Sequence, residues 1–216
     1  VASSSVDLIV TDPPYGIDYK SGKQNYDTRG ETPVIKDRDE YFEKIENDHE
    51  IPVQWLAEAY RVLKEGSAMY VFCHWKTYDI LKQATEYAGF ELKNLIVMNK
   101  SNHGMGDLKG SYAPKHELLM FACKGRHRLR FPDGRKSDVW NVPVKFSKAI
   151  RLHPNEKPLS WIEPCIINSS DEGDLVLDPF AGSATVALCC KNLKRNHISM
   201  EIEGKFVEEA RRRLDG

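Results

Sequence analysis

The sequence predicts an α/β fold of the Rossmann-like type, with a mostly parallel β-sheet and helices on both of its faces. The alternation of two kinds of segment predicts this fold. Short apolar runs rich in β-branched residues, typical of buried strands, alternate along the chain with stretches whose apolar residues recur at helical spacing. Such alternation favours parallel strands joined by helices that cover the sheet. A length of 216 residues suits one compact domain, so we expect a single domain over residues 1–216.

The first part of the chain predicts a strand, a long loop and then a regular alternation. Residues 6–11 form an apolar, β-branched run that stops where Pro13 and Pro14 cannot continue a strand ladder. Residues 20–50 are polar and contain glycines and a proline, which predicts a mobile loop, with a short helix near Tyr41, that serves as a lid. Patterning then predicts a helix at 55–63, a strand at 69–73, a helix at 78–87, and strands at 92–98 and 118–123.

A basic stretch separates these elements from the last ones. Between Lys100 and Lys157, thirteen Lys and Arg residues stand against five Asp and Glu residues. Such a stretch is either a solvated face or a contact for a polyanion, and the motifs that flank it in the sequence determine which interpretation is favoured. After it we expect a helix starting at Pro158, a strand at 175–177, a helix at 184–190, a strand at 197–200 and a helix at 206–214.

Composition argues against several other classes of protein. No run of about 18 apolar residues occurs, and the first residues lack the basic start and apolar core of a secretion signal. We therefore expect a cytoplasmic protein without a membrane partner. The five cysteines include no C-x-x-C pair and are scattered through apolar stretches, which predicts neither disulfides nor a structural zinc site. Cys189 and Cys190 are interpreted as core residues.

A turn of small residues is the first candidate site. The apolar run at 175–177 enters the sequence Asp178-Pro179-Phe180-Ala181-Gly182-Ser183-Ala184-Thr185, which opens a predicted helix. Small residues let a ligand approach the backbone, and free N–H groups at a helix start can hold a carboxylate. Glu201 ends another predicted strand, where an acceptor for ribose hydroxyls would stand. A tight strand-to-helix turn with an exposed glutamate fits the same pattern.

The second candidate site is the sequence Asp12-Pro13-Pro14-Tyr15 at the end of the first predicted strand. The exocyclic amine of a nucleobase is a poor nucleophile because its lone pair is delocalised into the ring. The Asp12 carboxylate and the Pro13 carbonyl can each accept one N–H of such an amine and stabilise the charge that develops during attack. The prolines hold these acceptors stiffly, and Tyr15 offers a ring on which an extruded base can stack. A proline-rich turn that only ends a strand is the alternative.

Three motifs in one order resemble the beta-class amino-methyltransferases of DNA. They are D-P-P-Y at 12–15, H-P-N-E-K-P at 153–158 and D-P-F-A-G-S-A-T at 178–185, so that the catalytic half precedes the cofactor half. The resemblance extends over nearly the whole chain, including residues 111–117 and 138–140. It implies a methyltransferase fold with an antiparallel strand near one edge of the sheet. It also implies S-adenosylmethionine as the cofactor and double-stranded DNA as the partner.

The resemblance further implies roles for individual residues. Asp12, Pro13, Pro14 and Tyr15 should hold the target base. The cofactor should be surrounded by Asp178, Pro179, Phe180, Ala181, Gly182, Ser183, Glu201, Lys157 and Pro158, with Glu201 on the ribose. A short target-recognition insert should lie near residues 125–152, next to the edge of the sheet at which the strand before Asp12 ends. Its basic residues should meet DNA phosphate: Arg126, Arg128, Arg130, Lys145, Lys148 and Arg151.

We therefore expect a site-specific DNA methyltransferase that modifies the N6 amine of adenine after flipping the base out of the stack. The sulfonium of the cofactor already makes the methyl group electrophilic, so the protein must supply alignment and no metal. Because the insert is short and offers few side chains to read bases, we expect a short recognition sequence or a relaxed preference. A cognate restriction endonuclease and a second copy of the chain are further candidate partners.

Other functions fit parts of the same pattern. The nearest methylates N4 of cytosine, although relatives acting there more often carry serine at the position of Asp12. A catalytically inactive DNA-binding relative would share the fold, but the intact D-P-P-Y sequence argues against it. RNA and protein glutamine also offer amine or amide nitrogens, and the motif order and the basic stretch disfavour the protein substrate.

Two features depart from the family pattern. Ala184 stands where members often carry a second glycine, and we expect its methyl group to fit. The printed sequence begins almost at the catalytic strand, whereas relatives usually carry a further strand with a Gly-Asp pair before it. A trimmed chain, a strand supplied otherwise and weaker cofactor binding are the alternatives. His74 and Trp75, which follow the strand at 69–73, are interpreted as a structural histidine and as packing or a pocket wall.

Overall fold

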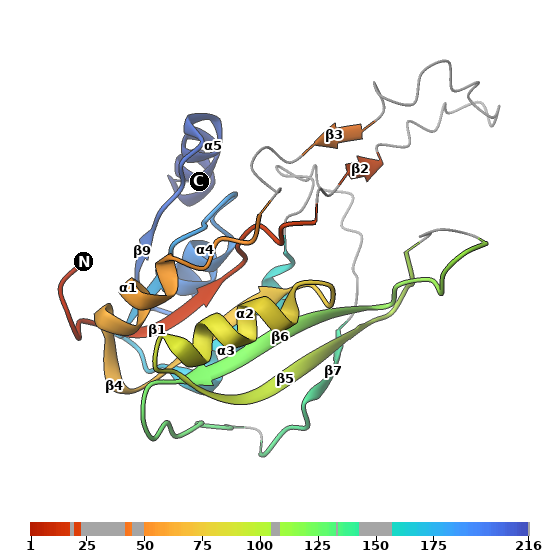
Figure 1. Ribbon diagram of the computed structural model, residues 1–216. Coiled ribbons are helices and arrows are strands. Elements are labelled where there is room, and N and C mark those ends of the chain that lie inside the picture. The colour runs from red at the N-terminus through yellow and green to blue at the C-terminus, as the bar shows by residue number, and fades with distance from the viewer. Residues whose placement is uncertain are drawn as a thin grey trace.

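The computed structural model describes residues 1–17, 20–22, 42–44, 50–104, 109–132, 134–142 and 157–215. Within these ranges seven strands form one mixed sheet in the order β7-β5-β6-β4-β1-β8-β9 (Figure 1). Their bounds are β1 Val6–Thr11, β4 Leu63–Cys73, β5 Glu91–Lys100, β6 His116–Cys123, β7 Val139–Val142, β8 Leu175–Asp178 and β9 Asn196–Ser199. This sheet, with helices packed on it, confirms the predicted Rossmann-like α/β fold.

The directions of the strands distinguish the two sides of the sheet at which the strands begin and end. β1 pairs in parallel with β4 and β8, β8 with β9, and β5 with β7, whereas β6 is antiparallel to both β4 and β5. We call the side where the parallel strands end and β6 begins the carboxyl edge, and the opposite side the amino edge. The reversed strand expected near one edge is β6, which is the third strand from the β7 side. In open α/β sheets ligands bind at the carboxyl edge.

Helices cover both faces of the sheet. They are α1 Trp55–Val62, α2 Tyr78–Tyr87, α3 Leu159–Ser169, α4 Thr185–Asn192 and α5 Gly204–Asp215. α1 and α2 pack on one face, α3 and α4 on the other, and α5 stands beyond β9 (Figure 1). None of the helices in the described part of the chain has the length and apolarity needed to cross a membrane.

The interior strand β1, between β4 and β8, is buried on both faces, which fixes the residues that follow it. Leu8 and Val10 pack toward α3 and α4, and Val6 and Ile9 pack toward α1 and α2. These side chains are fully buried, as expected for a parallel strand inside an α/β sheet. β1 therefore holds its carboxyl end, where the D-P-P-Y motif (residues 12–15) begins, in a rigid position.

The predicted elements are present, with three differences. Leu63, predicted as the last residue of a helix, has an extended backbone and begins β4. β7 was not expected from its four residues, because so short a segment gives too little alternation to stand out. In the predicted loop at 20–50, the short strands β2 Lys20–Gly22 and β3 Phe42–Lys44 pair antiparallel. The rest of that stretch up to residue 49, including the helix expected near Tyr41, and residues 143–152 of the expected insert lie outside the described residues.

Candidate functional site

The two predicted sites lie side by side at the carboxyl edge. The D-P-P-Y motif follows β1, and Asp178 ends the neighbouring strand β8 and opens the small-residue turn (residues 178–185). A buried hydrogen bond joins them, because Thr11 Oγ1 donates to Asp178 Oδ1 over 2.7 Å. The last residue of β1 therefore links the strand end that carries Asp12 to the strand end that carries Asp178.

The Asp12 carboxylate lies at the centre of a compact polar cluster. Tyr15 OH donates to Asp12 Oδ1 at 2.7 Å, and Lys157 Nζ donates to Asp12 Oδ2 at 2.7 Å. Lys157 Nζ also donates to Tyr15 OH at 3.1 Å. Burial and the nearby charge of Asp12 raise the pKa of Tyr15 well above its usual value, so the phenol keeps the proton that it donates. Each carboxylate oxygen has a second lone pair and can still accept another N–H.

The backbone of the motif is fixed from two further sides. The Tyr15 ring stacks on His74, with ring centroids 6.1 Å apart and planes 28° apart, and Thr77 Oγ1 donates to the Tyr15 carbonyl over 2.9 Å. Gly16 has φ +66°, and a Cβ there would come within 2.4 Å of Ile51 N. Only glycine combines that backbone conformation with such a close approach. The segment leaving the motif is thus held in one path.

The small-residue turn is tied to the end of β9. Gly182 N donates to Glu201 Oε2 over 2.8 Å, and Glu203 N donates to Glu201 Oε1 over 2.9 Å. A Cβ placed on Gly182 would meet no atom within 4 Å, so open space adjoins this turn. Asp178 is buried, accepts from the Phe180 N–H at 3.1 Å, and has a pKa raised to about 7, mainly by desolvation.

Ala184 shows what the missing second glycine means for the turn. Ala184 directly precedes α4 as its N-cap residue, with φ 59° and ψ 37°, the left-handed region, and its side chain is buried. The methyl group is accommodated, as expected, but a non-glycine residue in this conformation costs about 1–2 kcal/mol. Free N–H groups at the start of α4 remain directed toward the carboxyl edge, where an anion is stabilised.

These residues fit S-adenosylmethionine. The cofactor carries a cationic sulfonium and ammonium, ribose hydroxyls and a carboxylate. Asp178 in the turn and Glu201 after β9 offer carboxylates for the first two kinds of group. The start of α4 suits the third, and the open space at Gly182 allows a close approach. Phe180 is half-buried and packs edge-on against Trp55, with ring centroids 5.6 Å apart.

Comparison with known proteins identifies the family. A family model described as DNA methylase matches residues 6–212. The chain belongs to the N6/N4 DNA methylase family. It is 32% identical to the type II methyltransferase M.HpaI of Haemophilus parainfluenzae, over 98% of this chain and 69% of that protein. It is 29% identical to the type II methyltransferase M2.DpnII of Streptococcus pneumoniae, over 98% of this chain and 83% of that protein.

Solved structures agree with this family. The complex of M1.HpyAVI with S-adenosylmethionine matches with a TM-score of 0.71 at 26% identity, covering 97% of this chain and 89% of that one. The PvuII DNA methyltransferase, described as cytosine-N4-specific, shares the fold with a TM-score of 0.72 at 17% identity, over 99% and 80% of the two chains. The cofactor of this DNA methylase is S-adenosylmethionine, as expected.

The structure adds two contacts that the sequence reading of this methylase missed. Lys157, expected beside the cofactor, donates to both Asp12 and Tyr15, a contact that was not expected. Arg213 of α5 donates from Nη1 to the Ser183 carbonyl over 2.8 Å and so ties the last helix to the small-residue turn. No sequence signal marked Arg213, because its partner lies thirty positions earlier and on another element.

The basic residues expected next to the catalytic edge are partly elsewhere. β6 runs toward the amino edge and ends at Cys123, so Arg126, Arg128 and Arg130 follow it at the amino edge, opposite Asp12. Arg130 pairs there with Asp171 just beyond the end of α3. The expectation that these three arginines adjoin the catalytic edge is wrong, because one reversed strand moves them across the sheet. Lys145, Lys148 and Arg151 lie outside the described residues.

His127, between these arginines, belongs to a buried network. Its Nδ1 lies 2.8 Å from the Gly66 carbonyl, which only accepts, so Nδ1 carries the proton. Nε2 then accepts from Ser169 Oγ at 3.1 Å, and Tyr70 OH lies 2.9 Å from the same Oγ. Burial lowers the pKa of His127, the charge of Arg130 lowers it further, and the bond to Gly66 opposes both effects.

This network predicts an acid-sensitive contribution to stability. Because the folded state lowers the pKa of His127, its contribution is present above the unfolded pKa of about 6.5 and is lost as pH falls through the folded value. We expect the melting temperature of the wild type to fall more between pH 7.5 and pH 5 than that of His127→Gln. Differential scanning fluorimetry across this range measures the difference.

The comparison with His127→Gln is essential because the buried Asp178 changes the stability in the opposite direction as pH falls. Its raised pKa means that protonation of Asp178 favours the folded state as pH falls. Only the difference between wild type and His127→Gln isolates the histidine. The exposed His197, replaced in the same way, is the matched control and should follow the wild type. Parallel curves for wild type and His127→Gln would contradict the assignment.

Proposed function

We propose that this DNA methylase transfers the methyl group of S-adenosylmethionine to the N6 amine of adenine in double-stranded DNA. The observation that carries the proposal is the Asp12 carboxylate, which Tyr15 and Lys157 hold at the end of a buried strand. The preceding residue, Thr11, is hydrogen-bonded to Asp178 in the small-residue turn, so the two motifs are neighbours. A carboxylate at this position favours adenine, because relatives that act on cytosine more often carry serine there.

The residues of the D-P-P-Y motif prepare the amine. Asp12 accepts one N–H of the adenine amine and the Pro13 carbonyl accepts the other, which draws the lone pair out of the ring plane. Tyr15 supplies a ring for the extruded base on the side not covered by His74. Tyr15 OH and Lys157 keep the carboxylate oriented while it accepts, so the alignment is set before the base arrives.

The small-residue turn and the end of β9 hold the methyl donor. Glu201 accepts hydrogen bonds from the ribose hydroxyls, and the start of α4 binds the carboxylate. When bound, the cofactor would supply an electrophilic methyl carbon attached to a sulfonium that is a good leaving group. The amine nitrogen forms the new bond, and the proton that it then loses passes to the Asp12 carboxylate, to which it is hydrogen-bonded, and from there to solvent. The Thr11–Asp178 bond fixes the distance between donor and acceptor sides.

Two wider expectations belong to the same proposal. The relatives described as type II methyltransferases favour a cognate restriction endonuclease as a partner in the cell. Because Asp12 lies at the carboxyl edge, we expect DNA to bind there. A second copy of the chain is a further predicted partner.

The test is transfer of labelled methyl from S-adenosylmethionine to unmethylated double-stranded DNA. The DNA is digested to nucleosides and the labelled product is identified by mass and chromatographic retention. N6-methyladenine is the expected product. N4-methylcytosine would keep the mechanism and correct the base, and label in RNA but not in DNA would overturn the substrate.

A further inference from the structure

Trp75 is an exposed aromatic residue beside the Asp12 cluster. Among the four tryptophans, Trp161 is buried, Trp55 and Trp140 are half-buried, and Trp75 has 64% of its surface exposed. Nothing in the packing of the described residues requires a large apolar ring at this position. A single exposed apolar ring is common on protein surfaces, so the position of Trp75 relative to the D-P-P-Y motif and the side chains around it must carry the argument.

The turn that carries Trp75 is attached directly to the D-P-P-Y motif. Thr77 Oγ1 donates to the Tyr15 carbonyl, and the Thr77 N–H donates to the His74 carbonyl over 3.1 Å. Rings form a series from the motif outward: Tyr15 stacks on His74, and the His74 and Trp75 centroids are 5.7 Å apart with planes at 35°. Trp75 is therefore the outermost ring of a series that starts at the motif, held on a turn that cannot move independently of Tyr15.

Basic side chains lie near Trp75, and Asp79 in the first turn of α2 is the acidic residue close to the same turn. Lys76 Nζ lies 5.7 Å from the centroid of the indole ring. The paired strand β6 begins at His116, and Cys73 pairs with Leu118, so the turn after β4 lies beside the start of β6. Exposed Lys115 and His116 stand there. Cations around an exposed aromatic surface are the combination with which proteins hold a nucleic acid strand and stack on its bases.

We infer that Trp75 stacks on a base that remains in the DNA beside the extruded adenine, and so stabilises the opened duplex. Its place in the ring series supports this position. Tyr15 lies against Asp12 and can reach only the extruded base, whereas Trp75 lies outside His74 and faces solvent at the carboxyl edge. A base becomes available for stacking there only once its neighbour has left the duplex. The inference rests on the proposed DNA substrate and assigns Trp75 the role of stabilising the duplex after the adenine has left the stack.

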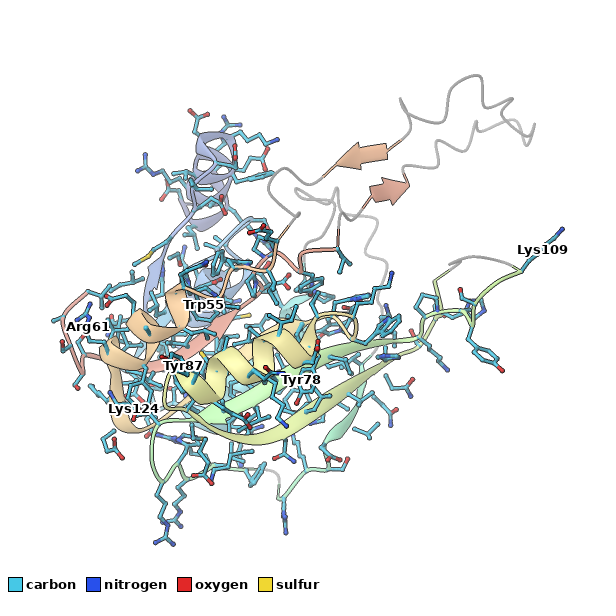
Figure 2. All side chains as sticks on the ribbon, viewed as in Figure 1. Trp55, Arg61, Tyr78, Tyr87, Lys109 and Lys124 are labelled. Atoms are coloured by element: carbon cyan, nitrogen blue, oxygen red, sulfur yellow. The ribbon has the colours of Figure 1, made fainter. Side chains whose placement is uncertain are left out.

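Matched variants separate stacking from structure. Trp75→Ala removes the ring, Trp75→Leu keeps apolar bulk without a flat face, and Trp75→Phe keeps a flat ring. Tyr87→Ala is the control, because Tyr87 is 95% exposed on the same helix-and-turn unit but at the other end of α2. Figure 2 shows Tyr78 and Tyr87 at opposite ends of α2, with Lys109 on the side of Tyr78 and Lys124 on the side of Tyr87.

The experiment first locates the methylated adenine by sequencing treated DNA with a method that detects N6-methyladenine. It then places 2-aminopurine at that position and records its fluorescence as protein is added. Wild type, Trp75→Phe and Tyr87→Ala should give a large rise, since an unstacked 2-aminopurine is bright, whereas Trp75→Ala and Trp75→Leu should give a much smaller one. On duplex DNA, kcat/KM should fall roughly 5- to 150-fold for Ala and Leu, the range expected for one lost base stack, and little for Phe. The KM for S-adenosylmethionine should not change.

The possible failures are distinguishable. If the wild type transfers no methyl to DNA, the proposed function fails and the stacking role that rests on it is overturned with it. If the wild type methylates DNA and Trp75→Leu matches it in fluorescence and within twofold in kcat/KM, the stacking role is overturned. A changed melting temperature for Trp75→Ala together with a normal fluorescence response of Trp75→Leu would assign Trp75 a structural role and also overturn it.

Discussion

Replacing Asp12 with alanine is expected to lower the rate of methyl transfer by about 100- to 1,000-fold or more, the cost of removing one group that stabilises developing charge. Asp12 is the point on which both Tyr15 OH and Lys157 Nζ converge, so the variant loses the acceptor for the amine and also leaves a lysine ammonium without its carboxylate. Both changes oppose the positive charge that develops on the attacking nitrogen. Affinity for S-adenosylmethionine should stay within a few-fold, because the Thr11–Asp178 bond and the Glu201 contacts do not involve the Asp12 side chain.

Single-turnover transfer and calorimetric titration of the cofactor measure the two quantities separately. Asp12→Asn is the matched variant, since it keeps one acceptor oxygen and the same shape, and should lose less rate than alanine. The pattern to expect is a lost rate with retained cofactor binding. An equal loss of both in the alanine variant would show that Asp12 supports the cofactor side, and would remove the role assigned to it.

The adjacency of the two motifs could be predicted because each of them follows a buried strand. Parallel strands end at one edge, so Asp12 after β1 and Asp178 at the end of β8 had to share that edge once both were recognised as strand ends. The direct pairing of β1 with β8, and the Thr11 hydrogen bond between them, could not be predicted without the strand order. That order cannot be inferred from the pattern of a single sequence.

The direction of β6 is the clearest limit of the sequence reading. An apolar run such as residues 118–123 predicts a buried strand equally well in either direction, because burial depends on which residues are apolar and not on the direction of the chain. β6 runs opposite to its neighbours, and this places the arginines that follow it at the amino edge.

Two residues show why side-chain roles were harder to predict than strands. Lys157 lies beside the cofactor motif in the resemblance, but its ammonium reaches Asp12, a contact across 145 positions of sequence. Trp75 was interpreted as packing or a pocket wall, and only its exposure on a turn bonded to Tyr15 distinguishes it from a core residue. Long-range contact and exposure are properties of the folded chain.

Replacing Glu201 with alanine is expected to have the opposite signature to the change at Asp12. Glu201 Oε2 accepts from Gly182 N and Oε1 from Glu203 N, which fixes the carboxylate between the small-residue turn and the start of α5. In this position its remaining lone pairs are available to ribose hydroxyls. A hydrogen bond to a charged group contributes about 1.5–3 kcal/mol, so loss of one such bond should raise the Kd for S-adenosylmethionine roughly 10- to 150-fold. The rate at saturating cofactor should change little.

The control is Glu203→Ala, which removes a carboxylate two residues away but keeps the backbone N–H that binds Glu201. Because Glu203 touches Glu201 through its backbone, its variant should bind the cofactor almost as the wild type does. Glu201→Gln keeps one acceptor oxygen and should fall between wild type and alanine. If Glu201→Ala instead lowers the saturated rate while the Kd stays unchanged, Glu201 acts on alignment and not on ribose binding. The two sides of the carboxyl edge, Asp12 for the amine and Glu201 for the cofactor, would then not be separable in the way that their hydrogen bonds indicate.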